Sequence, residues 1–374
     1  MKKIAIIGAD KSRLHYYKQV KALGYYIVGI AWEEGAVCRE LCDVFYPISF
    51  KDKEAVLTAC QKEQIDGITS FALETALPTV IYVSQKMGLV SNTEECIALT
   101  QTKYAQRRAF ESAGLPVPAY YQIDAVEQLH QLQCRYPMVM KPVDSGGSRG
   151  IYKVNDEKQM LEAYQDVVRY SPSGKAIIEE YIDGREFSVE YISHNGRHYF
   201  LQITDKVTSG EPHFVEMQHH QPANISESLS LRIREMVEKA LTALKIENSA
   251  SHTEIKLNSK DELYIIEIGA RMGGDRIASD LVRLSTGYDF VEGVVKLACG
   301  DFEEPKKTLN CYSGVYFYSA LQPFVADYVK NKDKYPEIVD ASINNLPLVP
   351  VVSNGQRNGY LLYQSQNHKF VIYE

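Results

Sequence analysis

The sequence predicts an α/β N-terminal domain built on a parallel sheet, followed by two α+β units and a small C-terminal β-rich segment. Short apolar runs alternate with amphipathic runs over the first hundred residues, and mixed strand-like and helix-like patterns follow them. The stretch after Gly300 consists of short runs rich in Tyr, Val and Pro. At 374 residues the chain is long enough for two or three domains.

The N-terminal domain is expected to follow βαβαβ order, which forms a parallel sheet flanked by helices. Ser91 and Glu94 have the spacing of a capping box, so a further helix is expected to begin there. Pro116 and Pro118 then enforce an extended connector. The periodicity predicts strands at 4–7, 27–31, 44–48 and 65–71 and helices at 14–23 and 55–60.

The α+β units follow this connector. Asn195-Gly196 supplies the positive φ angles of a tight hairpin turn between two strand-like runs. A helix is expected over 229–244, and a polar turn joins the strands that follow it. The predicted strands are 137–141, 176–180, 187–192, 198–203, 253–257 and 263–268, with a helix at 156–168.

Composition and charge argue against several classes of protein. With 45% hydrophobic and 24% charged residues the chain has a globular composition, and its net charge of −7 argues against a nucleic-acid partner. No apolar stretch approaches the roughly 18 residues that span a bilayer, so a cytoplasmic protein without membrane contact is expected. The seven cysteines form neither a disulfide framework nor a metal-binding knuckle. The oligomeric state stays open, a homodimer included.

Two common nucleotide-binding fingerprints are absent from the sequence. Gly8 follows an apolar strand, but the other glycines of the dinucleotide fingerprint are missing. The Gly-x-x-x-x-Gly-Lys-Ser/Thr phosphate loop does not occur. A nucleotide site in this chain would therefore be built differently.

The first candidate motif is a lysine that ends a strand, followed by a Gly/Ser-rich loop. Lys141 precedes three glycines and two serines, whose backbone N–H groups can surround phosphate oxygens without Cβ atoms in the way. The motif indicates an anion site, although a flexible surface hairpin explains it equally well. The loop consists of Ser145, Gly146, Gly147, Ser148, Arg149 and Gly150.

Two glutamates lie seven residues apart around a glycine turn. A strand, a turn and a second strand would present a connector backbone near Glu179 to a purine edge and the carboxylate of Glu186 to ribose hydroxyls. Taken alone, the pattern is more typical of an ordinary acidic strand end.

A further pair, Glu254 and Glu267, lies on two strands joined by a polar turn. In a hairpin both carboxylates can face the same side, where they repel each other unless a cation lies between them. Mg²⁺ takes one or two carboxylates together with nucleotide phosphates. A salt bridge from Glu267 to Arg271 or Lys256 is the alternative.

The stretch after the second of these strands carries Arg271 ahead of a helix that is predicted to start near Ile277. Arginines and helix N-termini both stabilise developing oxyanions. Gly273, Gly274 and Asp275 lie between the two and complete the candidate set.

Taken together and in this order, these segments resemble the ATP-grasp superfamily, in particular its carboxylate-amine ligases of the L-amino acid ligase type. Residues 140–151, 178–190 and 252–275 carry the resemblance, and biotin carboxylase and the purine-pathway ligases are more distant relatives. The resemblance implies an N-terminal α/β domain over 1–100, an ATP-grasp domain over 101–300 with a small lobe at about 116–182, and a C-terminal β-rich extension over 301–374.

The resemblance also implies roles for single residues. It implies that Lys103 and Lys141 reach the phosphates of ATP, that loop 145–150 covers them, and that Glu186 binds ribose. The adenine hinge would be Glu179, Glu180, Tyr181 and Ile182. Glu254 and Glu267 would bind Mg²⁺, for which Mn²⁺ is a substitute, and Arg271 and Lys141 would be catalytic. Weaker implied substrate contacts are Lys206, Glu216, His219, His252, Gly273, Gly274 and Asp275.

One position departs from many relatives, because the Asn expected two residues after the second metal glutamate is Gly269 here. The implied reaction joins a carboxylate to an amine: a carboxylate oxygen attacks the γ-phosphate of ATP, ADP leaves, and the acyl phosphate reacts with an amine, preferably that of an amino acid. An ATP-dependent carboxylase or formate-using ligase of purine or biotin type, and a non-catalytic ATP-binding regulator, are the alternatives.

Overall fold

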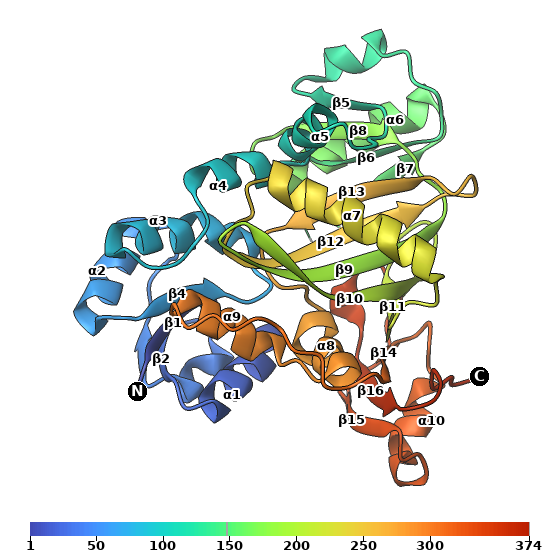
Figure 1. Cartoon of the computed structure of the whole chain (residues 1–374). Coiled ribbons are helices and arrows are strands. Elements are labelled where there is room, and N and C mark those ends of the chain that lie inside the picture. The colour runs from blue at the N-terminus through green and yellow to red at the C-terminus, as the bar shows by residue number, and fades with distance from the viewer. Residues whose placement is uncertain (147–148, 374) are drawn as a thin grey trace.

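The structure is a computed structural model that describes residues 1–146 and 149–373. Its described part contains a four-stranded parallel sheet, a four-stranded antiparallel sheet and an eight-stranded antiparallel sheet. Figure 1 shows the antiparallel four-stranded sheet as a separate lobe above the larger sheet, with the N-terminal domain to one side. The predicted fold class is confirmed.

The N-terminal sheet has the strand order β3-β2-β1-β4, with every neighbouring pair parallel. Its central strands read as continuous apolar runs because helices cover both faces. β2 and β3 are added on one side of β1, and β4 is added on its other side. The strand order therefore reverses at β1, and the loops after β1 and β4 meet at a crevice. The elements are β1 (Lys3–Ile7), α1 (Leu14–Ala22), β2 (Tyr26–Ile30), β3 (Val44–Tyr46), α2 (Lys53–Glu63), β4 (Gly67–Ser70) and α3 (Leu77–Met87).

One of the covering helices comes from far along the chain. Helix α9 (Phe290–Ala298) shares a buried apolar cluster with β1 and α1, where Phe290 and Val295 pack with Ile4 and Tyr16. Figure 1 shows α9 beside β1 and β4. The approach is close at Gly67, where a Cβ atom would lie 2.6 Å from the backbone of Ala298. The N-terminal domain therefore includes a helix that residues 1–100 do not supply.

Two short helices lead into the small lobe. Thr102 caps α5 by accepting a hydrogen bond from the N–H of Ala105, which places Lys103 in the first helical turn. The small lobe is a sheet of order β5-β8-β6-β7 covered by α6. The elements are α4 (Glu94–Thr100), α5 (Lys103–Ser112), β5 (Tyr120–Ile123), β6 (Met138–Pro142), β7 (Tyr152–Val154), α6 (Glu157–Val167) and β8 (Ala176–Glu180).

The large sheet begins with the predicted hairpin. Asn195 and Gly196 have φ of 50° and 75°, as a turn of this type requires. Apolar side chains of β9 and β12 alternate with polar ones, and the apolar face packs against α7. The polar face carries the candidate site. The elements are β9 (Arg185–His194), β10 (Arg197–Thr208), β11 (Glu216–Gln221), α7 (Glu227–Ala243), β12 (Ser249–Leu257) and β13 (Leu263–Gly269).

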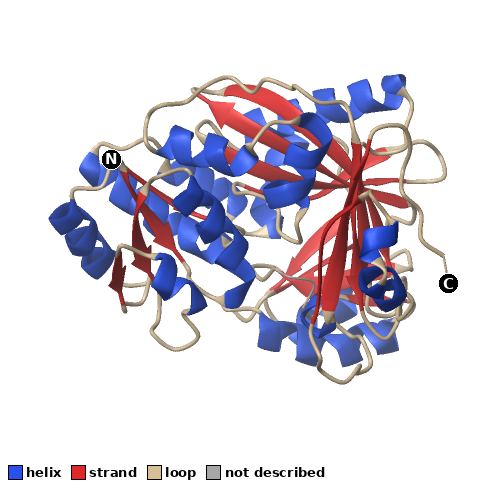
Figure 2. Cartoon of the chain, turned by 90° about the horizontal axis from the view of Figure 1, so that it is seen from below, coloured by secondary structure: helices blue, strands red, loops and turns tan. Residues whose placement is uncertain are grey.

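The C-terminal strands continue this same sheet, in the order β13-β12-β9-β10-β11-β14-β16-β15. Residues 301–374 were expected as an extension of their own, whereas β14 pairs directly with β11. Figure 2 shows the strands of the large sheet gathered apart from the N-terminal strands, with helices around both groups. The remaining elements are α8 (Val282–Thr286), β14 (Tyr312–Tyr318), α10 (Val325–Lys330), β15 (Ile338–Ile343) and β16 (Gly359–Ser365).

Two local predictions need correction. The capping box of Ser91 and Glu94 is wrong, because α4 begins at Glu94 and the Ser91 hydroxyl donates to the carbonyl of Asn92 instead. The side-chain oxygen of Asn92 accepts hydrogen bonds from the backbone N–H groups of Glu247 and Asn248. The residues just before α4 are thus bonded to a distant segment and not to the helix. The helix expected near Ile277 does start there, but its first turn is a π-helix over Ile277–Leu281.

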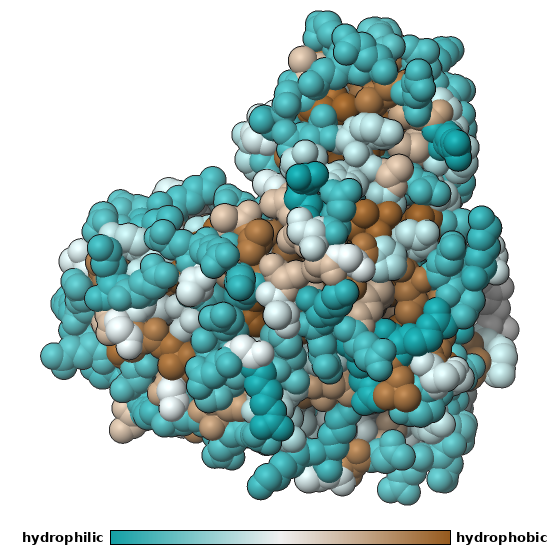
Figure 3. Space-filling model, turned by 45° about the horizontal axis from the view of Figure 1, so that its top comes forward, coloured by the Kyte–Doolittle hydropathy of each residue, from teal (hydrophilic) through white to brown (hydrophobic). Residues whose placement is uncertain are grey.

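The outer surface is mostly polar. Figure 3 shows hydrophilic side chains over most of the face that includes the small lobe, with apolar residues in scattered groups. Among the described residues, no helix has the length and apolar character needed to cross a bilayer.

Candidate active site

A cavity of about 530 Å³ lies where the three sheets come together. The loops after β1 and β4, the first turn of α5, the end of β6 and the polar face of the large sheet all contribute to its wall. The predicted site residues that line it are Lys103, Lys141, Ser145, Gly146, Glu216, His252, Glu254, Glu267, Arg271, Gly274 and Asp275.

Other predicted residues lie next to this wall without forming it. Gly147 and Ser148 lie outside the described residues, so only Ser145 and Gly146 of the predicted phosphate loop precede the gap. The predicted residues outside the cavity wall are Glu179, Glu180, Tyr181, Ile182, Glu186, Lys206, His219 and Gly273.

Glu254 and Glu267 are directly opposite each other on β12 and β13, as the hairpin pattern predicted. Their side chains are 28% and 26% exposed and face the cavity. One oxygen of each is taken: Oε1 of Glu254 accepts from Lys206 at 2.9 Å, and Oε1 of Glu267 from Lys103 at 3.1 Å. Among the described residues neither Oε2 has a hydrogen-bond partner. Two carboxylates with free oxygens fit Mg²⁺, which completes its coordination with phosphates and water.

A closed ion-pair network lies beside this pair, at the junction with the small lobe. Glu179 accepts from Arg107 and from Lys141, each at 2.5 Å, and all three side chains are buried. Burial would raise the pKa of Glu179, but Arg107 and Lys141 hold it at about 2. Burial lowers the pKa of Lys141. Lys141 thus reaches the cavity wall with the carboxylate of Glu179 fixed beside it.

The backbone of the predicted adenine hinge is largely occupied. Glu179 lies inside β8 between two strands, the N–H of Glu180 donates to Ala119 and the N–H of Tyr181 donates to Pro137. The ammonium of Lys153 lies 4.4 Å from the centre of the Tyr181 ring. The Glu179 side chain therefore forms ion pairs. A role of Glu179 in binding adenine stays a prediction.

Lys206 lies at the centre of a carboxylate cluster. Its ammonium contacts Glu186 and Glu254 at 2.9 Å and Glu216 at 2.6 Å. Burial would lower the pKa of Lys206, but these carboxylates hold it well above its ordinary value. A substrate contact was expected for Lys206; in the structure its buried ammonium pairs with three carboxylates, of which Glu216 and Glu254 line the cavity.

A β-bulge brings two further residues to the same face. The pairing of β10 with β11 skips Met217, since Val207 pairs with Gln218 and Thr208 with Glu216. Glu216 and His219 are three positions apart, so strict alternation would place their side chains on opposite faces of the sheet. The extra residue turns Glu216 to the same face as His219. Their side chains approach to 3.2 Å, although neither ring nitrogen of the fully buried His219 makes a hydrogen bond to the described residues.

His252 is held as a cation between two glutamates. Nδ1 contacts Glu190, and Nε2 lies 3.7 Å from Glu254. Burial would lower the pKa of His252, but Glu190 raises it to about 9. At neutral pH this imidazolium has no free lone pair, so it cannot accept a proton. Gly273 lies against it, where a Cβ atom would be 2.6 Å from Nδ1.

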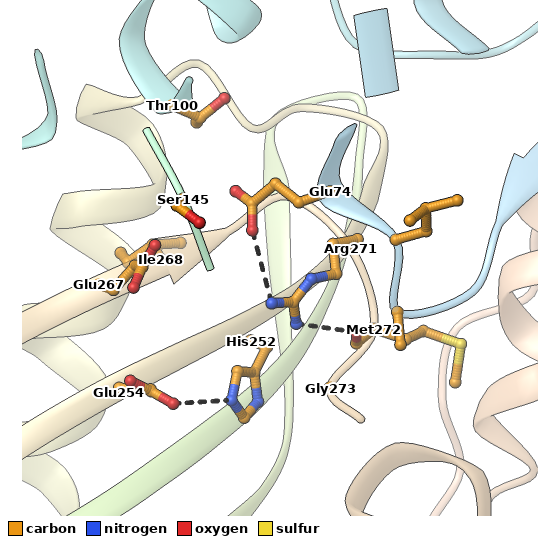
Figure 4. Close-up of polar contacts among 12 residues, drawn as sticks. Glu74, Thr100, Ser145, His252, Glu254, Glu267, Ile268, Arg271, Met272 and Gly273 are labelled. Carbon is orange, nitrogen blue, oxygen red and sulfur yellow. Dashed lines mark hydrogen bonds and ion pairs between the residues drawn. The ribbon is translucent and has the colours of Figure 1, made fainter. Parts of the chain in front are cut away.

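Arg271 spans the gap to the N-terminal domain. Figure 4 shows its guanidinium pointing toward Glu74, which lies in the loop after β4. Nη2 lies 3.5 Å from Glu74, and Nη1 donates to the carbonyl of Met272 at 3.0 Å. Burial would lower the pKa of Arg271, but Glu74 and Glu267 raise it.

The glycine that departs from the family pattern has a steric reason. A Cβ atom on Gly269 would lie 3.1 Å from the guanidinium carbon of Arg271. A side chain at this position would crowd the guanidinium, which would have to shift by a few tenths of an ångström. Gly269 therefore leaves room for Arg271.

Several cavity residues were missed by the sequence analysis. Glu74, Lys11, Ser12 and His15 follow β4 and β1, and the rule that ligands bind at the carboxyl ends of strands where their order reverses could have found them. Phe317 and Asn354 have no such signal, because long-range contacts alone place them. The same holds for Arg107, which pairs with Glu179 and does not line the cavity.

Comparisons with known proteins agree with this geometry. Residues 134–280 match the model of the ATP-grasp domain family. The chain is 25% identical over 310 residues to the uncharacterized protein y4rH of Sinorhizobium fredii, covering 80% of this chain and 63% of that protein. It is 23% identical over 270 residues to alanine–anticapsin ligase of Bacillus subtilis, covering 66% of this chain and 56% of that protein. The chain thus spans less than two thirds of these relatives' length.

The fold of the whole chain is similar to that of an L-amino acid ligase from Bacillus licheniformis. The two superpose with a TM-score of 0.81 at 23% identity, over 98% of this chain and 94% of that one. Residues 134–280 of the chain therefore form an ATP-grasp domain, and the fold of the whole chain is that of this L-amino acid ligase.

Proposed function

We propose that the chain is an ATP-dependent ligase that joins a carboxylate to an amine through an acyl phosphate, releasing ADP and phosphate, with an amino acid among its substrates. The observation that carries the proposal is the pair of glutamates at 254 and 267, whose free oxygens face a cavity that also presents Lys103, Lys141 and Arg271. This arrangement suits the terminal phosphates of a nucleotide and the cation bound to them.

Glu254 and Glu267 would hold Mg²⁺, which when bound neutralises charge on the β- and γ-phosphates. Lys103, from the first turn of α5, donates to the carbonyl of Ser145 at 2.7 Å and so ties that helix to the phosphate loop. Lys141 and Arg271 add positive charge to the wall of the cavity. Electrostatic stabilisation at the terminal phosphate is the main task in phosphoryl transfer.

The reaction then needs two substrates in one cavity. A carboxylate oxygen attacks the γ-phosphorus and the bond to ADP breaks; the amine nitrogen next attacks the acyl carbon, phosphate leaves, and the nitrogen loses a proton. Arg271 can pair with a carboxylate, whereas Glu74, Glu216 and Asp275 line the same cavity and attract an ammonium group. A site with both charges suits an amino acid.

The similarity to an L-amino acid ligase and to alanine–anticapsin ligase supports this substrate class. The relatives' names describe those proteins, and the particular carboxylate and amine of this chain stay open. A location in the cytoplasm fits an enzyme that depends on ATP and stays part of the proposal.

The test is a phosphate-release screen over pairs of amino acids, with nucleotide chromatography after turnover. The proposal predicts ADP and phosphate in proportion to an amide-type product. AMP as the stoichiometric product would overturn it. ADP formed with bicarbonate or formate, but with no amino acid pair, would favour the carboxylase-type or formate-type alternative. Absence of any nucleotide turnover, with ATP still bound, would favour a regulator.

A further inference from the structure

The C-terminal segment reaches the candidate active site through one short turn. A 3₁₀ turn over Asn354–Gln356 precedes Arg357, and Asn354 lines the cavity. The turn is locally fixed, because the side-chain oxygen of Gln356 accepts from the backbone N–H groups of Val352 and Ser353 at 2.7 and 2.8 Å. It can therefore hold other groups in place.

The turn binds the backbone of Glu216 on both sides. The side-chain oxygen of Asn354 accepts from the N–H of Glu216 at 3.1 Å, and Nη1 of Arg357 donates to the carbonyl of Glu216 at 3.2 Å. These bonds fix the first residue of β11, next to the bulge that turns Glu216 toward the cavity.

The same two side chains bind Asp275. Nη2 of Arg357 pairs with one carboxylate oxygen of Asp275, and the amide of Asn354 donates to the other at 3.3 Å. The Arg357 side chain is only 9% exposed, and its guanidinium carbon lies 3.8 Å from the centre of the Phe317 ring. That ring also contacts His219 edge to face, with centroids 5.6 Å apart. Arg357 is thus packed as well as paired.

The backbone at Asp275 needs this support. Asp275 and Arg276 have φ of 49° and 69°, two consecutive residues other than glycine in the left-handed region. Such residues are strained and persist only where their surroundings hold them. Arg357 and Asn354 hold the first, and the Tyr360 ring, 4.1 Å from the Arg276 guanidinium carbon, holds the second.

We infer that Asn354 and Arg357 are positioning residues for the amine substrate, because they aim the carboxylates of Glu216 and Asp275 at one end of the cavity. This inference rests on the proposed ligase function. Neither residue contacts Glu254 or Glu267, whose carboxylates are held by Lys206 and Lys103. Lys206 also holds the carboxylate of Glu216, and neither Asn354 nor Arg357 bonds to Lys206. Loss of the turn should therefore disturb capture of the amine and leave the first half of the reaction intact.

Hydroxylamine separates the two halves of the reaction. It is small and uncharged at neutral pH, and it traps an acyl phosphate as a hydroxamate without needing an oriented ammonium site. The experiment measures hydroxamate formation, and separately the kinetics of amide formation with an amino acid amine, for wild type, Arg357→Ala, Asn354→Ala and Arg357→Lys.

The expected result is a rise of about tenfold or more in KM for the amine in Arg357→Ala, with hydroxamate formation and KM for ATP within about twofold of wild type. Asn354→Ala should shift the same constant in the same direction. Arg357→Lys should rescue only part of the loss, because lysine keeps the charge but lacks the fork that reaches Asp275 and Glu216 together.

Arg232→Ala is the matched control. Arg232 also binds a carboxylate and a carbonyl, those of Asp261, but on the outer surface of α7 away from the cavity. It should leave every constant unchanged. An unchanged amine KM in both Arg357→Ala and Asn354→Ala, or an equal loss of hydroxamate and amide formation, would overturn the inference. Wild type that forms neither hydroxamate nor amide would overturn the proposed function itself.

Discussion

Two glutamates of this chain have the same local sequence and different surroundings. Glu179 and Glu267 each follow two isoleucines near the end of a strand. The Glu179 carboxylate is 2% exposed and enclosed by Arg107 and Lys141, whereas the Glu267 carboxylate is 26% exposed, contacts Lys103 through one oxygen and turns the other to the cavity.

The difference shows what decides the role of a carboxylate. A buried carboxylate is costly unless cations and hydrogen bonds surround it, and Glu179 meets that condition in full. Glu267 meets it in part, so a further cation can bind there. The cations that make the difference come from α5 and β6, far from either glutamate in the sequence.

Of the two glutamates, the partly exposed Glu267 should matter most for turnover. Replacing Glu267 with Ala removes one of the two proposed Mg²⁺ ligands, and we expect turnover to fall about a thousandfold or more. The free energy of unfolding should change little, since a half-exposed charge is lost. ADP release and urea unfolding check both points. Glu262→Ala, on the exposed turn of the same hairpin, is the control, and near-normal turnover in Glu267→Ala would remove the metal assignment.

The buried and fully paired Glu179 should matter most for stability. Glu179→Gln leaves Arg107 and Lys141 buried without their counter-ion, and we expect the free energy of unfolding to fall by about 3–5 kcal/mol. Urea unfolding measures it. A loss below about 1 kcal/mol would mean that water reaches this network and that the two glutamates differ less than their exposure suggests.

His252 extends the comparison to a cation enclosed by glutamates. Its pKa of about 9 lies above the ordinary value of 6.5, so its contribution to stability is complete below pH 6.5 and is lost as the pH rises through 9. We expect a loss of about 3 kcal/mol over that range. His252→Gln should flatten the dependence of the urea midpoint on pH, and an equal slope in both proteins would contradict the pairing with Glu190.

Lys141 belongs to the closed network and to the cavity wall at once. Lys141→Ala should weaken ATP binding by about tenfold to a hundredfold and slow phosphoryl transfer, because a charge at the phosphate end is lost. Calorimetry with ATP and single-turnover kinetics measure both effects. Lys2→Ala, at the surface, should change neither, and unchanged ATP affinity in Lys141→Ala would limit Lys141 to a structural role.

The sequence predicted those parts of the site that depend on local pattern. Alternation along two strands put Glu254 opposite Glu267, and a strand end followed by glycines located Lys141. It could not show that Lys206 is paired with three carboxylates, because all three partners lie on other strands of the sheet. The sequence analysis predicted a site role for Glu216 and His219 only weakly, because a single inserted residue in β11 changes the face of the sheet on which a side chain lies.

Most of the contacts that the sequence analysis did not predict join segments that are far apart in the chain. Arg107 meets Glu179 across 72 residues and Arg357 meets Asp275 across 82, and neither arginine lies in a recognisable motif. The exceptions are Glu74, Lys11, Ser12 and His15, since strand order in the N-terminal sheet would have placed their loops at the site.

The eight-stranded sheet also sets a limit on the size of the substrates. Glu254 and Glu267 lie on strands at one edge of the sheet, and Glu216 lies on β11, three strands away from β12. Lys206 on β10 nevertheless joins Glu216 to Glu254, and the carboxylate oxygens of these two residues lie within 4.8 Å of one another. Under the proposed function, the phosphoryl donor and the incoming amine would therefore be bound close together. The reacting ends of the two substrates must fit that short distance, whereas the other walls of the cavity come from the small lobe and the N-terminal domain, each built on a sheet of its own.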